Sequence, residues 1–337
     1  MINNDLISII TPFKNSSIYI EECINSILKQ TIENWELIIV DDYSTDNSYD
    51  IVRKISLKDK RIKLYKNNSN NGIIEALRMG LDKSSGNYIT RMDSDDLMDP
   101  IKLEELYTNL KKNGKGYIST SCVKYFSKEG IGIGYKNYED WLNGLMINKN
   151  NYTDIYKECV IPSPNWMIHK EDLLTSGAFD LDIYPEDYDL VFRFYKNNIK
   201  VISSLKKLHL WRDYSSRTSR TDANYADNHF LDLKIKYFLE LHYNYNYELV
   251  IWGAGKKGKL LAKKLSEKKI DFSWVCDNPN KIGKNIYNKN LHDVKYLNEL
   301  NNYQAIITVA NKESQKLIKN FFDSKNLEKM KDYYYFC

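Results

Sequence analysis

The stretch Leu6–Asp42, LISIITPFKNSSIYIEECINSILKQTIENWELIIVDD, decides the fold class of this chain. Its apolar run at Leu6–Thr11 stops at Pro12, and a second apolar run at Trp35–Val40 stops at paired aspartates. Between the two runs, apolar residues recur at helical intervals over Ile20–Leu28. Because short apolar runs bounded by turn residues are typical of buried strands, the stretch predicts a strand–helix–strand unit.

The same alternation continues downstream of this unit. Two helices and two strands are predicted, in the order Ser48–Leu57, Ile62–Tyr65, Ile73–Leu81 and Tyr88–Met92. Such alternation is typical of a parallel sheet covered by helices, in which ligands bind beyond the carboxyl ends of the strands. Because three of these strands end at Thr11, Asp42 and Asp93, we expect one pocket to collect the three side chains.

Length and composition exclude several classes of protein. The chain has 337 residues, which favours two domains, and 42% of them are hydrophobic, as in a globular protein. A net charge of +4 is too small to indicate a nucleic-acid partner. Five cysteines without paired spacing indicate neither a disulfide framework nor a zinc site. Since the N-terminus is polar and no apolar run is long enough to span a membrane, we expect a cytoplasmic protein.

A domain boundary is predicted in the Asn- and Tyr-rich stretch Tyr243–Tyr247. Helical spacing over Asp222–Tyr243 precedes it, and a new strand–turn–helix–strand pattern follows it. We expect a first domain over residues 1–220, a linking helix over 221–246 and a smaller Rossmann-like α/β domain over 247–337. In the last domain, strands and one basic helix are predicted at Leu249–Trp252, Lys256–Lys269, Phe272–Cys276 and Ala305–Val309.

Carboxylates follow the fourth predicted strand. Asp93 and Asp95 alternate at the strand end, so their oxygens can converge on a hard divalent cation such as Mg²⁺ or Mn²⁺, with a diphosphate completing the coordination. Helix capping by Asp96 or Asp99, ahead of Pro100, is the other interpretation. The residues alone leave both open.

A second acidic cluster, Glu186, Asp187 and Asp189, begins a helix with apolar periodicity. Acidic residues in a first turn are stabilised by the helix dipole, which is one explanation. A carboxylate within hydrogen-bonding reach of a substrate hydroxyl is also what a general base requires. Since adjacent side chains point differently, one of Glu186 and Asp187 could hold the geometry while the other accepts the proton.

Four segments in a fixed order resemble glycosyltransferase family 2, the inverting enzymes with the GT-A fold. They are ISIITPFKN (Ile7–Asn15), IIVDDYSTDNS (Ile38–Ser48), YITRMDSDD (Tyr88–Asp96) and PEDYDLVFR (Pro185–Arg193). The resemblance extends to about residue 215. It implies a Rossmann-like mixed sheet with helices on both faces, and a nucleotide-sugar donor.

The resemblance also implies roles for individual residues. Thr11 and Pro12 would shape the floor beneath the donor nucleotide, and Asp42 would accept a hydrogen bond from the base, usually uracil. Asp93 would lie near the ribose and the metal, and Asp95 would be the direct metal ligand.

By the same resemblance, Asp187 would be the catalytic base, and Glu186 would orient the acceptor or Asp187. The metal would stabilise the departing diphosphate. Deprotonation of the acceptor on the opposite face of the sugar would then invert the anomeric configuration. A glycoside hydrolase needs two carboxylates that flank the bond, whereas these carboxylates group as a metal site and a base.

For three further residues, Tyr43, Arg78 and Trp166, the sequence is compatible with a role in binding or with a structural role. The family often has Gly at the position of Tyr43 and Asn near Arg78. Tyr43 could stack near the base and Arg78 could reach a phosphate, or both could be solvated surface residues. Trp166 lies in a stretch that resembles the acceptor side, where it could stack on a sugar ring; core packing is the alternative.

The stretch HLWRDYSSRTSR (His209–Arg220) combines a histidine with three arginines, which suit anion binding. By resemblance, a loop here closes over the diphosphate. Arg212, together with Arg217 and Arg220, is a candidate for this contact, and His209 is a candidate metal or phosphate contact. An exposed basic linker is the alternative.

The C-terminal glycine motif GAGKKG, with Gly253, Gly255 and Gly258, follows a predicted strand and begins a helix. This context lets backbone amides approach a phosphate, and Asp277 closes the next strand, where a dinucleotide site binds ribose. The segment is short for a complete dinucleotide fold and resembles half-Rossmann modules found beside sugar-modifying domains. We expect a docking, oligomerisation or regulatory module with a nucleotide as its candidate ligand.

These observations favour a metal-dependent inverting glycosyltransferase that moves a sugar from a nucleotide-diphosphate donor to a glycan or lipid-linked acceptor in cell-surface polysaccharide biosynthesis. Seven lysines in Lys256–Lys269 could contact an anionic membrane surface, or form a solvated face. A homo-oligomer is a further candidate assembly. A nucleotide-sugar sensor and a nicotinamide-dependent sugar oxidoreductase stay open as other classes.

Overall fold

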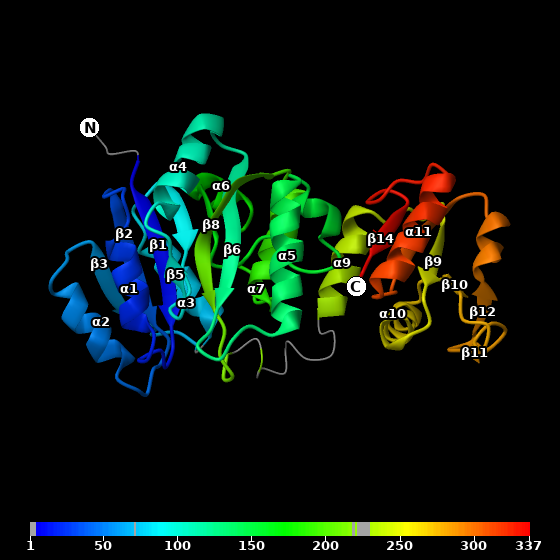
Figure 1. Cartoon of the computed structure of the whole chain (residues 1–337), viewed down its shortest axis with the longest axis horizontal. Helices are drawn as coiled ribbons and strands as arrows, with labels where there is room; N and C mark the ends of the chain where they lie inside the picture. The colour runs from blue at the N-terminus through cyan, green and yellow to red at the C-terminus, as the bar shows by residue number, and fades with distance from the viewer. Residues whose placement is uncertain (1–4, 71, 218–219, 221–229) are drawn as a thin grey trace. The chain divides into compact units, whose positions relative to one another are not determined.

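The structure, a computed structural model, describes residues 5–70, 72–217, 220 and 230–337 (Figure 1). The chain forms two compact units. The first comprises Met1–Tyr152 and Cys159–Thr221, and the second comprises Thr153–Glu158 and Asp222–Cys337. The N-terminal part of the helix expected over 222–243 lies outside the described residues.

The first half of the first unit alternates strands and helices. Its elements are β1 (Ile7–Phe13), α1 (Ile20–Leu28), β2 (Trp35–Asp41), α2 (Ser48–Ser56), β3 (Ile62–Lys66), α3 (Ile73–Asp82) and β4 (Tyr88–Arg91). Strands β1 to β4 pair in parallel, and every residue of β1, β2 and β4 is buried. Burial on both faces is why these strands read as continuous apolar runs rather than as alternating patterns.

The second half of the first unit completes a mixed sheet. Its elements are β5 (Leu97–Met98), α4 (Lys102–Asn113), β6 (Tyr117–Phe126), α5 (Ile133–Ile147), β7 (Trp166–His169), α6 (Lys170–Thr175), α7 (Glu186–Lys196) and β8 (Lys200–Arg212). The strand order is β3-β2-β1-β4-β7-β6-β8-β5, and β7 runs antiparallel to both of its neighbours. The Rossmann-like mixed sheet expected from the resemblance is confirmed.

Helices cover both faces of this sheet. Ile24 of α1 and Leu106 of α4 belong to one core cluster with residues of β1 and β2. Ala76 of α3 packs with Ile38 and Val40 of β2 in another. Close packing of α3 requires Gly80, because a Cβ there would lie 2.4 Å from Ile10 Cγ2. The helices on the two faces of the sheet therefore hold the carboxyl ends of β1, β2 and β4 at one edge.

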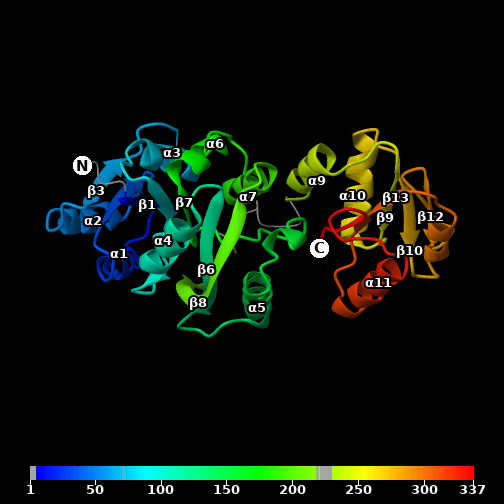
Figure 2. The same ribbon diagram turned by 90° about the horizontal axis from the view of Figure 1, so that it is seen from above.

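The second unit has a smaller sheet with α10 and α11 among its helices (Figure 2). Its elements are η1 (Asn151–Asp154, shared with the first unit), α9 (Phe230–Leu241), β9 (Glu248–Trp252), α10 (Lys256–Glu267), β10 (Ser273–Cys276), β11 (Asn285–Ile286), β12 (Lys289–Asp293), η3 (Val294–Asn298), β13 (Tyr303–Ile307), α11 (Lys312–Ser324) and β14 (Tyr333–Tyr335). The strand order is β11-β12-β10-β9-β13-β14, with β12, β10, β9, β13 and β14 parallel. The strand order reverses between β9 and β13, where doubly wound sheets bind ligands.

The unit boundaries differ from the expected ones, because α9 and the short segment Thr153–Glu158 both group with the second unit. Tyr156 explains the grouping of the segment. Its ring stacks on Phe336 with centroids 5.1 Å apart and meets Phe238 and Tyr334 edge to face. Within the described residues, no helix combines the length and the apolar character that crossing a bilayer requires.

Candidate active site

Asp42 follows β2 and is nearly fully buried. Its Oδ1 accepts hydrogen bonds from Asn67 Nδ2 at 2.8 Å and from the Gly72 amide at 3.0 Å. Tyr43, the next residue, has a φ of 60° and donates its hydroxyl hydrogen bond to the Ser69 carbonyl. The turn after β2 is therefore tied to the Asn-rich loop after β3, which fixes Asp42 at the edge of the sheet.

Thr11 and Pro12 are buried near the end of the neighbouring strand β1. Among the described residues, Thr11 Oγ1 has no hydrogen-bond partner. The Asp42 amide donates to the Phe13 carbonyl, so β1 and the turn after β2 stay paired up to the strand ends. The backbone at Thr11 and Pro12 can therefore form the surface that we expect beneath the donor nucleotide, with Asp42 beside it.

The acidic segment after β4 is held by partners from several elements. Asp93 Oδ1 accepts from Arg91 Nε at 2.8 Å, Asp95 Oδ2 accepts from the Tyr214 hydroxyl at 2.9 Å, and Ser94 Oγ lies 2.7 Å from Ser16 Oγ. Burial, with repulsion from the neighbouring aspartates, raises the pKa of Asp95 to about 7. Burial and the neighbouring aspartates therefore disfavour the ionised form of Asp95.

His209 of β8 lies behind this segment and is fully buried. Its Nε2 is 3.0 Å from Asp96 Oδ2, and its Nδ1 is 3.0 Å from Lys102 Nζ. Burial, reinforced by the Lys102 charge, lowers the pKa of His209 well below its usual value. Both ring nitrogens are engaged by protein groups, so this placement differs from the expectation that His209 contacts a metal or a phosphate.

Arg212, at the end of β8, supports the same segment. Its backbone amide donates to Asp96 Oδ1 at 2.8 Å, and its Nε donates to the Asp95 carbonyl at 2.6 Å. Its Nη2 lies 2.6 Å from Glu22 Oε2. These contacts make Arg212 a brace for the acidic segment, a different role from the expected contact with the diphosphate.

Glu186 and Asp187 begin α7, as the sequence predicts for an acidic first turn. Glu186 Oε1 accepts from Arg91 Nη1 at 2.8 Å, so Arg91 joins Glu186 to Asp93. Asp187 Oδ1 accepts from the Tyr188 amide at 2.7 Å. Burial, and next the Glu186 charge, raise the pKa of Asp187 to about 7, which suits a group that accepts a proton near neutral pH.

Arg78 of α3 binds the loop that leads to α7. Its Nε donates to the Phe179 carbonyl at 2.7 Å, and its Nη2 donates to the Asp180 carbonyl and to Asp182 Oδ1, each at 2.7 Å. Its Nη1 lies 2.6 Å from Glu75 Oε1. The guanidinium is therefore used in fixing this loop, which corresponds to neither the phosphate contact nor the solvated side chain that the sequence left open.

Trp166 of β7 is 4% exposed and meets Phe194 of α7 edge to face. Its carbonyl accepts a hydrogen bond from Thr90 Oγ1. The structure thus gives Trp166 the core-packing role, the alternative to stacking on an acceptor sugar.

The acidic residues fit a cation that is bound together with a diphosphate. In the described part of the chain, no three His, Cys, Asp or Glu side chains form a group that could hold a metal ion. Mg²⁺ is commonly bound by one or two carboxylates together with substrate phosphates and water. Asp93 and Asp95 could supply two such carboxylates, and a cation there would offset the burial and the repulsion from Asp96 and Asp93 that raise the pKa of Asp95.

The C-terminal glycines serve packing to a large extent. Gly253 has a φ of 119°, and a Cβ on Gly258 would lie 2.0 Å from the Gly253 carbonyl oxygen. Gly255 has open space around it, whereas Asp277 is exposed. Lys281 Nζ donates to the Ala254 carbonyl at 2.9 Å, so a lysine already lies against this turn.

Sequence reasoning did not single out Arg91, Tyr214 or Asn67. Arg91 lies inside the quoted segment YITRMDSDD, two residues before Asp93, and its basic side chain on an otherwise apolar strand was the available signal. The partners of Tyr214 and Asn67 come from distant segments, so their roles had no local signal.

The geometry defines an α/β domain with a mixed sheet, in which Arg91 joins two acidic segments. A family model described as glycosyl transferase family 2 matches residues 8–175. The chain is 33% identical over 205 residues to UDP-Glc:alpha-D-GlcNAc-diphosphoundecaprenol beta-1,3-glucosyltransferase WfgD of Escherichia coli, covering 59% of this chain and 73% of that protein. It is 29% identical over 224 residues to glycosyltransferase GlyG of Streptococcus pneumoniae, covering 65% and 74%.

The chain therefore belongs to glycosyltransferase family 2 and is a glycosyltransferase. Among solved structures, S. aureus TarS 1–349 in complex with UDP-GlcNAc has a TM-score of 0.55 and 19% sequence identity. The match covers 77% of this chain and 71% of that one. This likeness shows the GT-A fold.

Proposed function

We propose that this protein transfers a sugar from a UDP-sugar donor to a hydroxyl group of a glycan or lipid-linked acceptor, with inversion, in cell-surface polysaccharide biosynthesis. The observation that carries the proposal is the placement of Arg91, which binds Asp93 of one acidic segment and Glu186 of the other. A donor-binding group and a base must lie close together for glycosyl transfer, and Arg91 supplies that connection.

Asp187 is the proposed general base. Its pKa of about 7 leaves a substantial ionised fraction at neutral pH while keeping its oxygens basic enough to take a proton from a hydroxyl. The Tyr188 amide holds Oδ1 and so orients the carboxylate. Glu186, fixed by Arg91, is the proposed orienting residue, and its charge helps to raise the pKa of Asp187.

Asp42, Thr11 and Pro12 are the proposed nucleotide contacts. Asp42 uses Oδ1 for Asn67 and Gly72, and a base N–H would bind at its other oxygen. The choice of uracil is supported by WfgD, whose name specifies UDP-Glc as its donor.

Asp93 and Asp95 would hold a divalent cation, Mn²⁺ or Mg²⁺. When bound, the cation would stabilise the negative charge that develops on the departing diphosphate. Tyr214 and Arg91 each hold one oxygen of this pair, and Arg212 braces the Asp95 backbone.

The acceptor class is supported by WfgD, whose named acceptor carries a diphosphoundecaprenol group. Such an acceptor lies in a membrane, so we propose that the protein works at the cytoplasmic face of one. The lysines of α10 are candidate contacts with the anionic surface.

A donor panel tests the proposal. The full chain is incubated with UDP-, GDP- and dTDP-sugars, with and without Mn²⁺, in the presence of a diphosphoundecaprenol-linked sugar, and release of nucleoside diphosphate is measured. Release that requires acceptor and cation supports the proposal. Tight donor binding without any release under all these conditions would instead favour a nucleotide-sugar sensor.

A further inference from the structure

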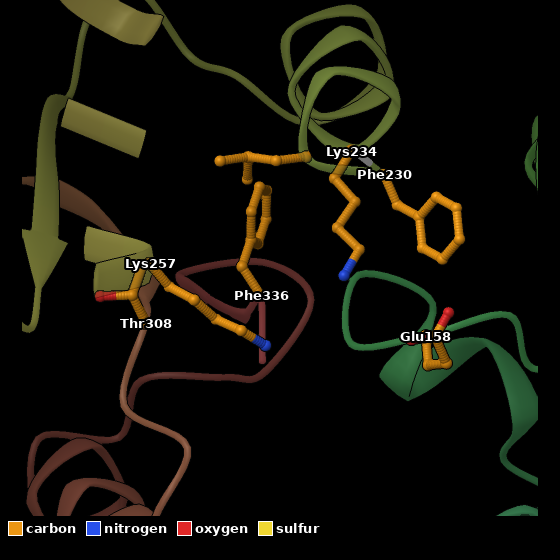
Figure 3. A pocket seen from close by; sticks show the side chains of 7 residues that line it. Glu158, Phe230, Lys234, Lys257, Thr308 and Phe336 are labelled. Atoms are coloured by element: carbon orange, nitrogen blue, oxygen red, sulfur yellow. The ribbon is translucent and has the colours of Figure 1, made fainter. Parts of the chain in front are cut away.

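Two lysines are buried among the described residues, which is unusual for a side chain that carries a charge. Lys234 lines a cavity of about 110 Å³ in the second unit (Figure 3). Lys102, the first residue of α4 in the first unit, is 0% exposed. A cation in the first turn of a helix is also disfavoured by the helix dipole. Because natural chains tend to break such local rules at functional sites, the position of Lys102 indicates a specific requirement for its charge.

Lys102 is connected to the acidic segment after β4 through His209. Lys102 Nζ donates to the Pro164 carbonyl at 2.8 Å and lies 3.0 Å from His209 Nδ1. An ammonium group has no lone pair, so Nδ1 accepts this hydrogen bond. Since the lowered pKa of His209 keeps its ring neutral, the ring proton lies on Nε2 and is donated to Asp96 Oδ2 at 3.0 Å. His209 therefore joins a buried cation to a buried carboxylate.

The Asp96 side chain anchors the turn that carries the candidate cation ligands. Its Oδ1 accepts from the Arg212 amide at 2.8 Å, and its own amide donates to the Asp93 carbonyl at 3.3 Å. Directly after Asp96, β5 pairs with β8, where Met98 lies opposite His209. The turn is thus closed by its backbone and fixed to β8 by the Asp96 carboxylate. A change in the orientation of Asp96 would therefore shift Asp95, the preceding residue.

We propose that Lys102 and His209 are positioning residues of the donor site, which hold Asp95 in the orientation that binds a divalent cation together with the nucleoside diphosphate. This inference rests on the proposed function and adds two residues that lie behind the acidic segment. Lys102 supplies the opposite charge that the buried Asp96 carboxylate requires. His209 supplies the direction from which that carboxylate is held, in the way that outer partners orient the ligands of a metal.

Binding of Mn²⁺ to the full chain in the presence of UDP tests the inference. The electron paramagnetic resonance signal of free Mn²⁺ is followed, with Mn²⁺ and UDP without protein as the reference. His209→Asn keeps an oxygen near the position of Nδ1 but loses the group that reaches Asp96, so it should weaken Mn²⁺ binding about tenfold or more. His209→Gln places an amide NH₂ group near the position of Nε2, so it should retain most of the affinity. A role in packing alone would affect both variants alike.

Lys102→Met tests the charge at the far end of the connection. It should weaken Mn²⁺ binding to a similar extent as His209→Asn, because Asp96 loses its buried counter-charge. His169→Asn is the matched control, since it makes the same substitution on β7 of the same sheet. Within the described part of the chain, His169 Nε2 is buried without a hydrogen-bond partner. This control should keep the wild-type affinity, and thermal unfolding of every variant verifies that it is folded during the titration.

The outcomes separate this inference from the proposed function. Weaker Mn²⁺ binding by folded His209→Asn and Lys102→Met, with affinity retained in His209→Gln and His169→Asn, supports the positioning role. Equal affinity in the wild type and His209→Asn, or equal losses in His209→Asn and His209→Gln, overturns it and leaves the proposed transfer reaction standing. If the wild-type protein binds no Mn²⁺ in the presence of UDP, the inference falls together with the cation proposed for transfer.

Discussion

Arg91 Nη1 lies 2.8 Å from Glu186 Oε1, although 95 positions separate the two residues in the chain. The same guanidinium binds Asp93 through Nε, and its side chain is 6% exposed. One buried cation therefore links the segment proposed to hold the metal with the segment proposed to hold the base.

Replacing Arg91 with methionine should destabilise the first unit strongly. Removing one partner of a buried ion pair leaves uncompensated charge and typically costs about 3–5 kcal/mol. Urea denaturation of Arg91→Met would measure the loss of unfolding free energy. Arg91→Lys, which keeps the charge but not the forked geometry, should fold better than Arg91→Met and still transfer sugar slowly. Normal turnover of the Arg91→Lys enzyme would show that sugar transfer does not require Arg91 to bind Asp93 and Glu186 at the same time.

Asp187→Asn should reduce kcat by about 10²–10⁴-fold while the donor Kd stays nearly unchanged, since loss of a general base removes proton transfer but no donor contact. Turnover and donor binding are measured separately to distinguish these effects. Asp180→Asn, at an exposed position of the preceding loop, serves as the control and should behave as wild type. Unaltered turnover in Asp187→Asn would exclude this residue as the base.

Asp95→Asn should abolish the dependence of donor binding on a divalent cation. One of two carboxylate ligands would be replaced by a neutral amide, and the remaining ligand would hold the cation weakly. Donor affinity is measured with and without Mn²⁺ in both proteins. Tyr214→Phe removes only the hydrogen bond to Asp95 and should cause a smaller loss. Full cation-dependent binding by Asp95→Asn would remove this residue from the site.

The turnover rate at saturating donor and cation should rise with pH through about 7 and then level off. Asp187 must be ionised to accept a proton, and its raised pKa places that ionisation near 7. Below this pH the carboxyl is protonated and inactive; above it, the base is fully available. Measuring kcat between about pH 5 and about pH 9 checks the sign and the midpoint. A rate that falls over this range, or a midpoint near 4, would contradict the assignment.

The strands and helices before Asp93 were predictable because each strand is an apolar run and each helix has its own periodicity. Apolar spacing found β1, β2, β3 and β4 to within two residues at each end. It could not give the antiparallel placement of β7 between β4 and β6, which depends on pairing across long separations. The mixed character of the sheet came from the family resemblance instead.

In the candidate site, too, some residues could be predicted from the local sequence and others could not. Asp42, Asp93 and Asp187 were recognisable because each follows a strand or begins a helix within a family segment. The partners that fix their environment were not, since 107 positions separate His209 from Lys102 and 101 separate Arg78 from the Phe179 carbonyl. Whether a polar residue faces substrate or a distant structural partner depends on tertiary packing, which local spacing does not encode.

Tyr156 belongs to the second unit although residues on either side of its short segment belong to the first. No single cut in the polypeptide can therefore separate the two units cleanly. A truncated protein that ends before α9 would keep Tyr156 but lose the rings of Phe238, Tyr334 and Phe336 that surround it. Such a fragment should expose this aromatic residue and aggregate more readily, so recombining the transferase unit with another C-terminal module would require redesign of residues 153–158 as well.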